Sequence, residues 1–221
     1  MPSGPVITRI ETFRNPEYPL IVWAQVHSSD GYVGLGETSF SPDAIETNIH
    51  TEIACYLLGE DPNRLDIHWD RMSRRFKIQR GRGVDSSSVS AIDMALWDLY
   101  AKRVNQPLYQ VLGGLSRDRI RVYNTCAGYS YGVKKKGGWK AGQIDYQPEQ
   151  PYEDFQAFMT DAGELADDLL SQGFTAMKIW PFDGYSNGTN GQFISATALD
   201  EDTEPFRKIR EKVGNRMDVM V

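Results

Sequence analysis

The sequence has little cysteine, no excess of basic charge and no long apolar run. Its 221 residues include only Cys55 and Cys126, without a CxxC spacing, so neither a disulfide framework nor a cysteine zinc site is indicated. The 24 lysine and arginine residues are outnumbered by 30 acidic residues, for a net charge of -6. This balance argues against a general nucleic-acid binder.

Two further absences concern targeting and membranes. The first residues lack a basic segment followed by an apolar run, and no later stretch approaches the roughly 18 apolar residues of a membrane span. We therefore expect a cytoplasmic protein that binds neither a membrane nor nucleic acid. The lysines at 134–136 are interpreted as part of a solvated loop rather than as a nucleic-acid patch.

The first half of the chain has the pattern of a small antiparallel meander followed by helices. Strands are predicted over residues 6–13, 20–26 and 32–37, where Gly34 and Gly36 indicate a bulge or a close approach of another backbone. Ser41, followed by a proline, is a candidate N-cap for a helix that ends at Gly59. Further helices are predicted over residues 65–76, 85–103 and 108–112.

Beyond Gly114 the pattern changes to alternating strands and helices. It predicts strands over 119–125, 174–180 and 217–221, separated by helices around 155–169 and 203–213. Such alternation is typical of parallel βα units. A closed eight-stranded βα barrel needs about 250 residues. These elements therefore predict either an open sheet or an incomplete barrel with two βα units and a third strand.

Three segments, in order along the chain, resemble the enolase superfamily in its mandelate racemase and muconate lactonizing enzyme branch. They are residues 31–37, 90–114 and 173–178, and the second, with Asp93, Trp97, Asp98 and its closing glycine pair, is the most specific. The resemblance implies an α+β capping domain at residues 1–115. It also implies that residues 116–221 begin a TIM-type (β/α) barrel, which this chain contains only in part.

The resemblance also implies a chemistry. Members of the superfamily use a divalent metal, usually Mg2+, to hold a substrate carboxylate while a base on the barrel removes the α-proton. Their ligands lie at the ends of the third, fourth and fifth barrel strands, so the first would follow Val221. We therefore expect no metal ligand in this chain and no activity from it alone. The full-length form is expected to bind a small carboxylate substrate and to form a homo-oligomer.

Lys178 is the catalytic candidate, selected both by the pattern and by the resemblance. Because the helix-facing side of a βα strand must be apolar, Met177 and Ile179 should face helices while Lys178 points into the barrel. Lys178 lies near the C-terminal end of its strand, where barrel active sites lie. A lysine that extends along the surface to reach solvent is the alternative.

Trp180 and Thr125 are the substrate-binding candidates. Racemases of the superfamily carry Lys-x-Lys, with the second lysine as a base, and Trp180 occupies that second position. This departure favours a sugar-acid dehydratase lineage, in which a histidine from late in the barrel can be the base. Trp180 is either a pocket wall or a core residue. Thr125 is predicted to face inward, as are Arg121 and Tyr123. Its hydroxyl group either donates a hydrogen bond to the substrate or forms a hydrogen bond with the backbone.

Other ligand-like residues are interpreted as structural. Asp66, His68 and Asp70 occupy alternate positions of a predicted helix and cannot converge on a metal. The glycine-rich segment 184–191 lacks the Gly-Lys-Ser/Thr ending of a phosphate-binding loop. Asp98 and its neighbours lie in the middle of a helix.

The sequence therefore predicts the lineage of a magnesium-dependent lyase that acts on a sugar acid. Two alternatives stay open. One is an epimerase, racemase or cycloisomerase of the same superfamily, and the other is a nonenzymatic remnant or binding module.

Overall fold

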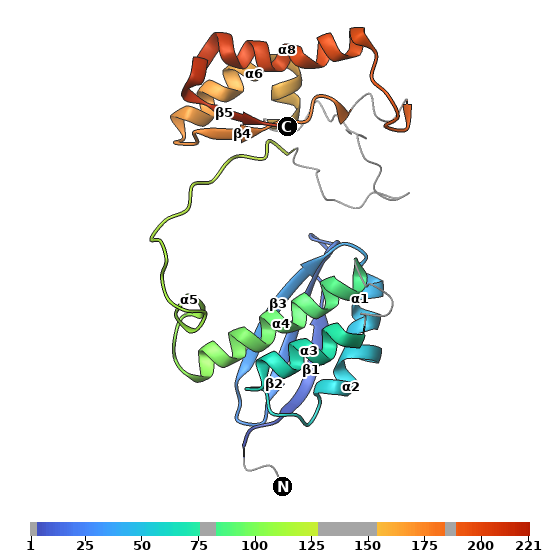
Figure 1. The fold of residues 1–221 in the computed structure, drawn as a ribbon. Helices are drawn as coiled ribbons and strands as arrows, with labels where there is room; N and C mark the ends of the chain where they lie inside the picture. The colour runs from blue at the N-terminus through green and yellow to red at the C-terminus, as the bar shows by residue number, and fades with distance from the viewer. Residues whose placement is uncertain (1–3, 76–82, 128–153, 184–188) are drawn as a thin grey trace. The chain divides into compact units, whose positions relative to one another are not determined.

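The computed structural model describes residues 4–75, 83–127, 154–183 and 189–221. The chain divides into two compact units, Met1–Asp118 and Arg119–Val221 (Figure 1). The lysine cluster at 134–136 and most of the glycine-rich segment 184–191 lie outside the described residues. Within those residues, no helix has the length and apolarity needed to cross a bilayer.

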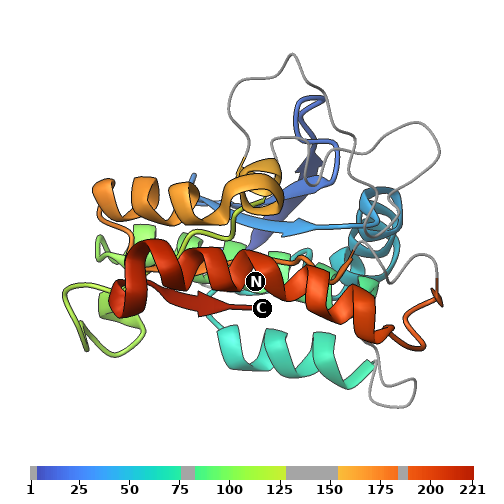
Figure 2. The same ribbon diagram turned by 90° about the horizontal axis from the view of Figure 1, so that it is seen from above.

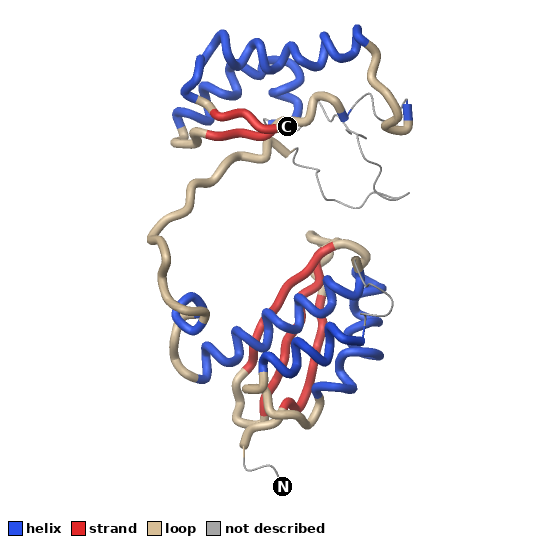
Figure 3. Tube along the Cα trace, in the orientation of Figure 1, coloured by secondary structure: helices blue, strands red, loops and turns tan. Residues whose placement is uncertain are grey.

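The first unit contains the predicted antiparallel meander. Its strands β1 (Ile7–Phe13), β2 (Ile21–Ser28) and β3 (Val33–Ser39) form one sheet in the order β1-β2-β3. Alternate residues of β2, namely Val22, Ala24 and Val26, are fully buried. They face the helices that cover one side of the sheet (Figure 3).

The helices of the first unit follow the predicted order. Pro42–Asn48 (α1), a π-helical turn at Ile49–Ile53 (η1) and Ala54–Leu57 (α2) are consecutive, followed by α3 (Leu65–Arg75), α4 (Val84–Arg103) and α5 (Leu108–Val111). The predicted cap is wrong in one respect. Ser41 precedes α1 in a left-handed conformation and makes no side-chain capping bond. Capping serines normally have extended backbone, which brings the hydroxyl group to the first-turn N–H groups.

Gly34 and Gly36 allow α4 to lie directly on β3. A Cβ atom placed on Gly34 would lie 1.8 Å from the carbonyl oxygen of Ala95, and one on Gly36 would lie 1.8 Å from that of Ala91. The β2–β3 register continues through both glycines without a shift. The glycines therefore mark a close approach of backbones and not a bulge.

Asp98 and Lys102 of α4 satisfy polar groups of β3, which is an edge strand. The Asp98 carboxylate accepts the backbone N–H of Leu35 at 2.7 Å, and it also accepts from Lys102 Nζ at 2.7 Å. Lys102 in turn donates to the carbonyl oxygen of Val33 at 2.9 Å. Because exposed strand edges attract other strands, this arrangement protects the sheet. The structural interpretation of Asp98 is confirmed.

The second unit has a small parallel sheet. Strands β4 (Ala176–Lys178) and β5 (Asp218–Met220) pair in parallel, and Asn124 adds a single parallel bridge to Met177. The predicted strand over residues 119–125 is therefore wrong except at Asn124. Ile120 and Val122, which a βα strand over these residues would pack against helices, are 69% and 58% exposed. Their alternation alone does not make a strand, because a strand also needs a neighbour to pair with.

Two helices cover one face of this parallel sheet. They are α6 (Asp154–Ser171) and α8 (Ala196–Val213), which lie alongside each other (Figure 2) and are followed by a 3-10 turn, η2 (Gly214–Arg216). The helix predicted around residues 155–169 is confirmed, and α6 buries one apolar stripe, formed by Phe155, Phe158, Ala162, Leu165 and Leu169.

Both helices depart from the predicted outline. α6 is kinked at Asp161, whose carboxylate accepts the N–H of Glu164 at 3.3 Å and so starts a second helical segment. α8 begins at Ala196 rather than at residue 203, because Ser195 caps it through a 3.1 Å bond from the N–H of Ala198. The helix continues through Pro205.

Candidate functional site

Three backbone segments meet at the C-terminal edge of the parallel sheet. The N–H of Lys178 donates to the carbonyl oxygen of Asn124 at 2.8 Å, and the N–H of Ile179 donates to that of Met220 at 3.1 Å. Parallel strands end at the same edge of a sheet. The residues that follow them, including Thr125 and Trp180, therefore belong to one edge.

The two faces of β4 differ as the alternation predicts. Met177 and Ile179 are fully buried among the residues of α6 and α8. Lys178 lies between them in sequence, is not part of this core and is half-buried. The predicted burial of Met177 and Ile179 against helices is confirmed, whereas the placement of Lys178 inside a barrel and its catalytic role stay predictions.

The ammonium group of Lys178 contacts aromatic rings. Its Nζ atom lies 5.7 Å from the ring centroid of Tyr123 and 5.3 Å from that of Trp180. Within the described residues, Lys178 forms no ion pair and its side chain donates no hydrogen bond. Ring faces attract a cation without neutralising its charge. This edge of the sheet can therefore attract an anion.

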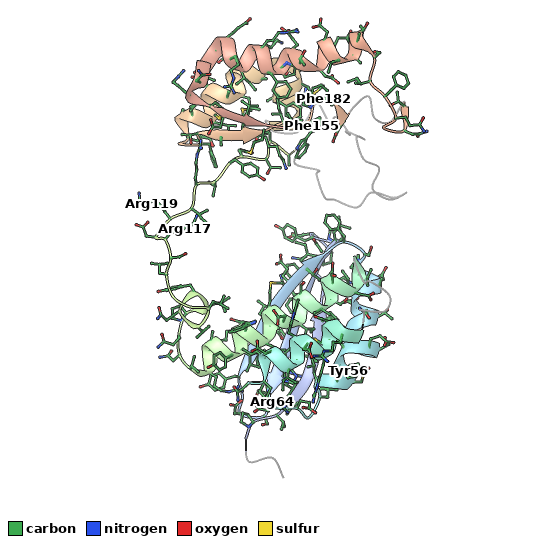
Figure 4. All side chains as sticks on the ribbon, viewed as in Figure 1. Tyr56, Arg64, Arg117, Arg119, Phe155 and Phe182 are labelled. Carbon is green, nitrogen blue, oxygen red and sulfur yellow. The ribbon has the colours of Figure 1, made fainter. Side chains whose placement is uncertain are left out.

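Trp180 packs against the core, and its role as a pocket wall stays a prediction. Its ring lies 6.3 Å from that of Phe155, a buried residue labelled in Figure 4, so it packs on the core beneath the helices. It also contacts Lys178. The structure thus brings Lys178 and Trp180 together. Thr125 is half-buried at the end of the neighbouring segment, and no contact joins its side chain to either residue among the described ones.

Asn124, Cys126 and Asp154 form a polar group on the helix-facing side that sequence reasoning missed. The side-chain oxygen of Asn124 accepts the N–H of Cys126 at 2.7 Å, and its amide also bonds to the Asp154 carboxylate. Burial raises the pKa of Asp154, and it raises the pKa of the Cys126 thiol to about 12. Cys126 is therefore a neutral, buried thiol and not a nucleophile. An Asx turn at Asn124 was the only available signal.

The N-terminal edge of the same sheet is closed by Arg121. Its guanidinium group donates to the carbonyl oxygen of Thr175 at 2.8 Å and pairs with the Asp218 carboxylate at 2.6 Å. These contacts join the segment before Asn124 to the starts of β4 and β5. Arg121 thus holds the strands together at the edge opposite to Lys178.

The described residues do not fit the magnesium ion that the resemblance implies. Among them, no three histidine, cysteine, aspartate or glutamate side chains gather into a group that could hold a metal ion. The ligand-like helix residues have other partners. His68 is buried and its Nε2 atom donates to the carbonyl oxygen of Asp61 at 2.7 Å, while Asp70 pairs with Arg74 at 2.6 Å.

An antiparallel sheet covered by helices on one face, followed by parallel βα elements with a lysine at a strand end, is the arrangement that the resemblance to the enolase superfamily implies. Residues 2–113 match the N-terminal domain of the mandelate racemase/muconate lactonizing enzyme family. This match covers half of the chain. The protein therefore belongs to that family, within the enolase superfamily.

Solved structures agree with this assignment. The chain is 36% identical to an enolase protein from environmental sequencing of the Sargasso Sea, covering 98% of this chain and 50% of that one with a TM-score of 0.78. It is 38% identical to an enolase of the mandelate racemase subgroup from Agrobacterium tumefaciens, with 98% and 49% coverage and a TM-score of 0.77. That structure contains a succinimide residue, sodium and phosphate.

A more distant similarity concerns a candidate galactarate dehydratase from Agrobacterium radiobacter, which was solved with sodium and L-malate. The identity is 26%, with 97% of this chain and 47% of that chain covered and a TM-score of 0.68. The present chain thus spans about half the length of the structures that it matches.

Proposed function

We propose that this chain supplies the capping domain and the first part of the (β/α) barrel of a lyase that dehydrates a sugar acid. The observation that carries the proposal is the ammonium group of Lys178, which has no carboxylate partner among the described residues and lies at the C-terminal edge of parallel strands. Active sites of βα barrels lie at that edge. Lys178 also occupies the first lysine position of the Lys-x-Lys pattern of the family's racemases.

The reaction begins with loss of the α-proton of the substrate. As the C–H bond breaks, its electron pair moves toward the carboxylate and gives an enediolate. An ammonium group fixed beside that carboxylate stabilises the charge that develops there. The hydroxyl group on the β-carbon then leaves and takes up a proton to form water. The remaining enol tautomerises to a 2-keto-3-deoxy acid.

Trp180 favours elimination over racemisation. Racemisation needs a base on each face of the α-carbon, and an indole N–H can donate but cannot accept a proton. With Trp180 in the second position, proton removal occurs from one face only, by a base outside the described residues. In this proposal, Trp180 forms a wall of the substrate pocket and the hydroxyl group of Thr125 donates to a substrate oxygen.

The choice of a sugar acid is supported by a relative. The candidate galactarate dehydratase from Agrobacterium radiobacter is 26% identical to this chain, and its structure contains L-malate, a hydroxy dicarboxylate. A chain with a cation at the corresponding strand end is suited to the same class of carboxylate ligand.

The test uses the product of the complete gene and a panel of aldonic and aldaric acids in D2O. We expect at least one acid to yield a 2-keto-3-deoxy acid, seen by proton NMR and by a colorimetric assay for 2-keto acids. Deuterium at an inverted α-carbon without loss of water would instead indicate an epimerase or racemase. Neither deuterium exchange nor product with any acid would contradict the proposal.

A further inference from the structure

Tyr123 is placed beside Lys178 by strand pairing and not by nearness in sequence. Asn124, the next residue, donates its N–H to the carbonyl oxygen of Ala176 at 3.0 Å and accepts the N–H of Lys178 at 2.8 Å. These two bonds fix the backbone of the Tyr123 segment against β4. The Tyr123 ring therefore reaches Lys178 Nζ, at 5.7 Å from its centroid, although it is 45% exposed.

Tyr123 and Trp180 approach the ammonium group from different segments. Trp180 comes two residues after Lys178 in the chain, whereas Tyr123 comes from the neighbouring segment. A lysine side chain has four flexible carbon–carbon bonds and a strongly hydrated charge, so it needs contacts to hold one position. A carboxylate partner would fix it but would also cancel its charge. Two aromatic rings restrict the ammonium group while leaving it fully charged.

We propose that Tyr123 is a positioning residue, which with Trp180 forms a two-ring clamp that holds the Lys178 ammonium ready to receive the substrate carboxylate. This inference rests on the proposed function. It adds a residue to which the sequence analysis gave an inward orientation but no role. The clamp acts through the aromatic ring of Tyr123, so the phenolic hydroxyl group is dispensable.

Three variants of the complete gene product test the clamp. Tyr123→Leu removes the ring, Tyr123→Phe keeps it, and Tyr109→Leu alters a half-exposed tyrosine of α5 as a matched control. The first readout is the ring-current shift of the Lys178 ε-methylene signal in NMR, assigned with the Lys178→Met variant. We expect Tyr123→Leu to lose a large part of the upfield shift and Tyr123→Phe to retain it. This readout needs no turnover.

The second readout uses affinity and kinetics. With L-malate as the probe, Tyr123→Leu should raise the Kd by about three- to tenfold, because one of two cation–π contacts is lost. With an active sugar acid, KM should rise by a similar factor while kcat changes by less than about twofold. Tyr123→Phe and Tyr109→Leu should both match the wild type.

Each result decides between the clamp and its alternatives. An unchanged ring-current shift and an unchanged Kd in Tyr123→Leu would overturn the clamp. A Tyr123→Phe variant as weak as Tyr123→Leu would also overturn it, because the hydroxyl group would then be responsible. If Lys178→Met abolishes turnover but Tyr123→Leu does nothing, only the clamp fails. If Lys178→Met keeps full turnover, the proposed function itself fails.

Discussion

Arg103 in the first unit and Lys178 in the second are two cations that each contact an aromatic ring, yet their partners differ. Arg103 donates to both carboxylate oxygens of Asp30, at 2.8 and 3.0 Å, and to the side chains of Asn63 and Ser28, at 2.6 and 2.8 Å. It also lies over a tyrosine ring. Lys178 has its two rings and, among the described residues, no carboxylate.

The difference separates a cation that stabilises a fold from one that can bind a ligand. Arg103 joins the end of α4 to the β2–β3 turn and to the loop before α3, and its side chain is only 15% exposed. Four of the five N–H groups of this guanidinium donate to side chains of the first unit, and its charge is paired with the Asp30 carboxylate. The Lys178 ammonium group joins no strands through hydrogen bonds or ion pairs among the described residues, so its charge can bind an anionic ligand. Arg121, which joins the strands at the opposite edge, resembles Arg103 because its guanidinium group is paired within the protein.

The largest effect on stability is expected for Arg103→Met. This change leaves Asp30 without its partner and removes four hydrogen bonds, so we expect the first unit to lose about 2–3 kcal/mol of unfolding free energy. Urea unfolding followed by circular dichroism measures the loss. Arg74→Met, which breaks an exposed pair with Asp70, is the control and should cost less than about 0.5 kcal/mol. Equal losses of unfolding free energy in the two variants would mean that Arg103 contributes no more to stability than an exposed ion pair.

A smaller effect is expected from acid. The hydrogen bonds from Arg103 lower the pKa of Asp30 from 3.8 to about 2. A carboxyl group whose pKa is lower in the folded state contributes stability above pH 3.8, and this contribution disappears as the pH falls toward 2. Because the Asp30 side chain is one-third exposed, solvent screening reduces the contribution to about 1 kcal/mol.

The acid prediction is tested by comparing the wild type with Asp30→Asn. Between pH 5 and pH 2 the wild type should lose about 1 kcal/mol more of unfolding free energy than the variant, as measured by urea unfolding at each pH. Parallel losses in both proteins would mean that Asp30 is not coupled to Arg103 as described.

The smallest effect is expected for Arg121→Met. Both members of its pair with Asp218 are more than half exposed, so we expect a loss of about 0.5–1 kcal/mol in the second unit. The change should appear as faster amide hydrogen exchange at Asp218, whose N–H donates to the carbonyl oxygen of Thr175. Unchanged exchange would show that Arg121 does not hold the strand starts.

The fold of the first unit could be predicted because its signals are local. Alternation over the three strands and the helical spacing of Val89, Ile92, Leu96 and Leu99 each depend on burial of one face, and all four of those residues are buried. The prediction of a strand at 119–125 failed because a strand also depends on non-local pairing. The alternation of this segment is a local signal, but strand hydrogen bonds need a neighbouring strand, and only Asn124 is paired. The kink at Asp161 was hidden by an unbroken apolar stripe, although Asp161-x-x-Glu164 is a capping signal.

The candidate site was predictable in part. The face of β4 that carries Lys178 follows from a period of two, and its position at a strand end follows from the length of the apolar run. The contact with Tyr123 could not be foreseen, because it depends on the register between two segments far apart in sequence. The contact of Trp180 with Phe155 likewise depends on how α6 packs.

The central claim is that Lys178 serves a carboxylate substrate and not the stability of the sheet. The most direct test measures kcat/KM for a sugar acid and the free energy of unfolding in the wild type and in Lys178→Met, both made from the complete gene. We predict that kcat/KM falls about a thousandfold in Lys178→Met, because charge stabilisation in the transition state is lost. The free energy of unfolding should change by less than about 1 kcal/mol. Unchanged turnover together with a clear loss of stability would contradict the account.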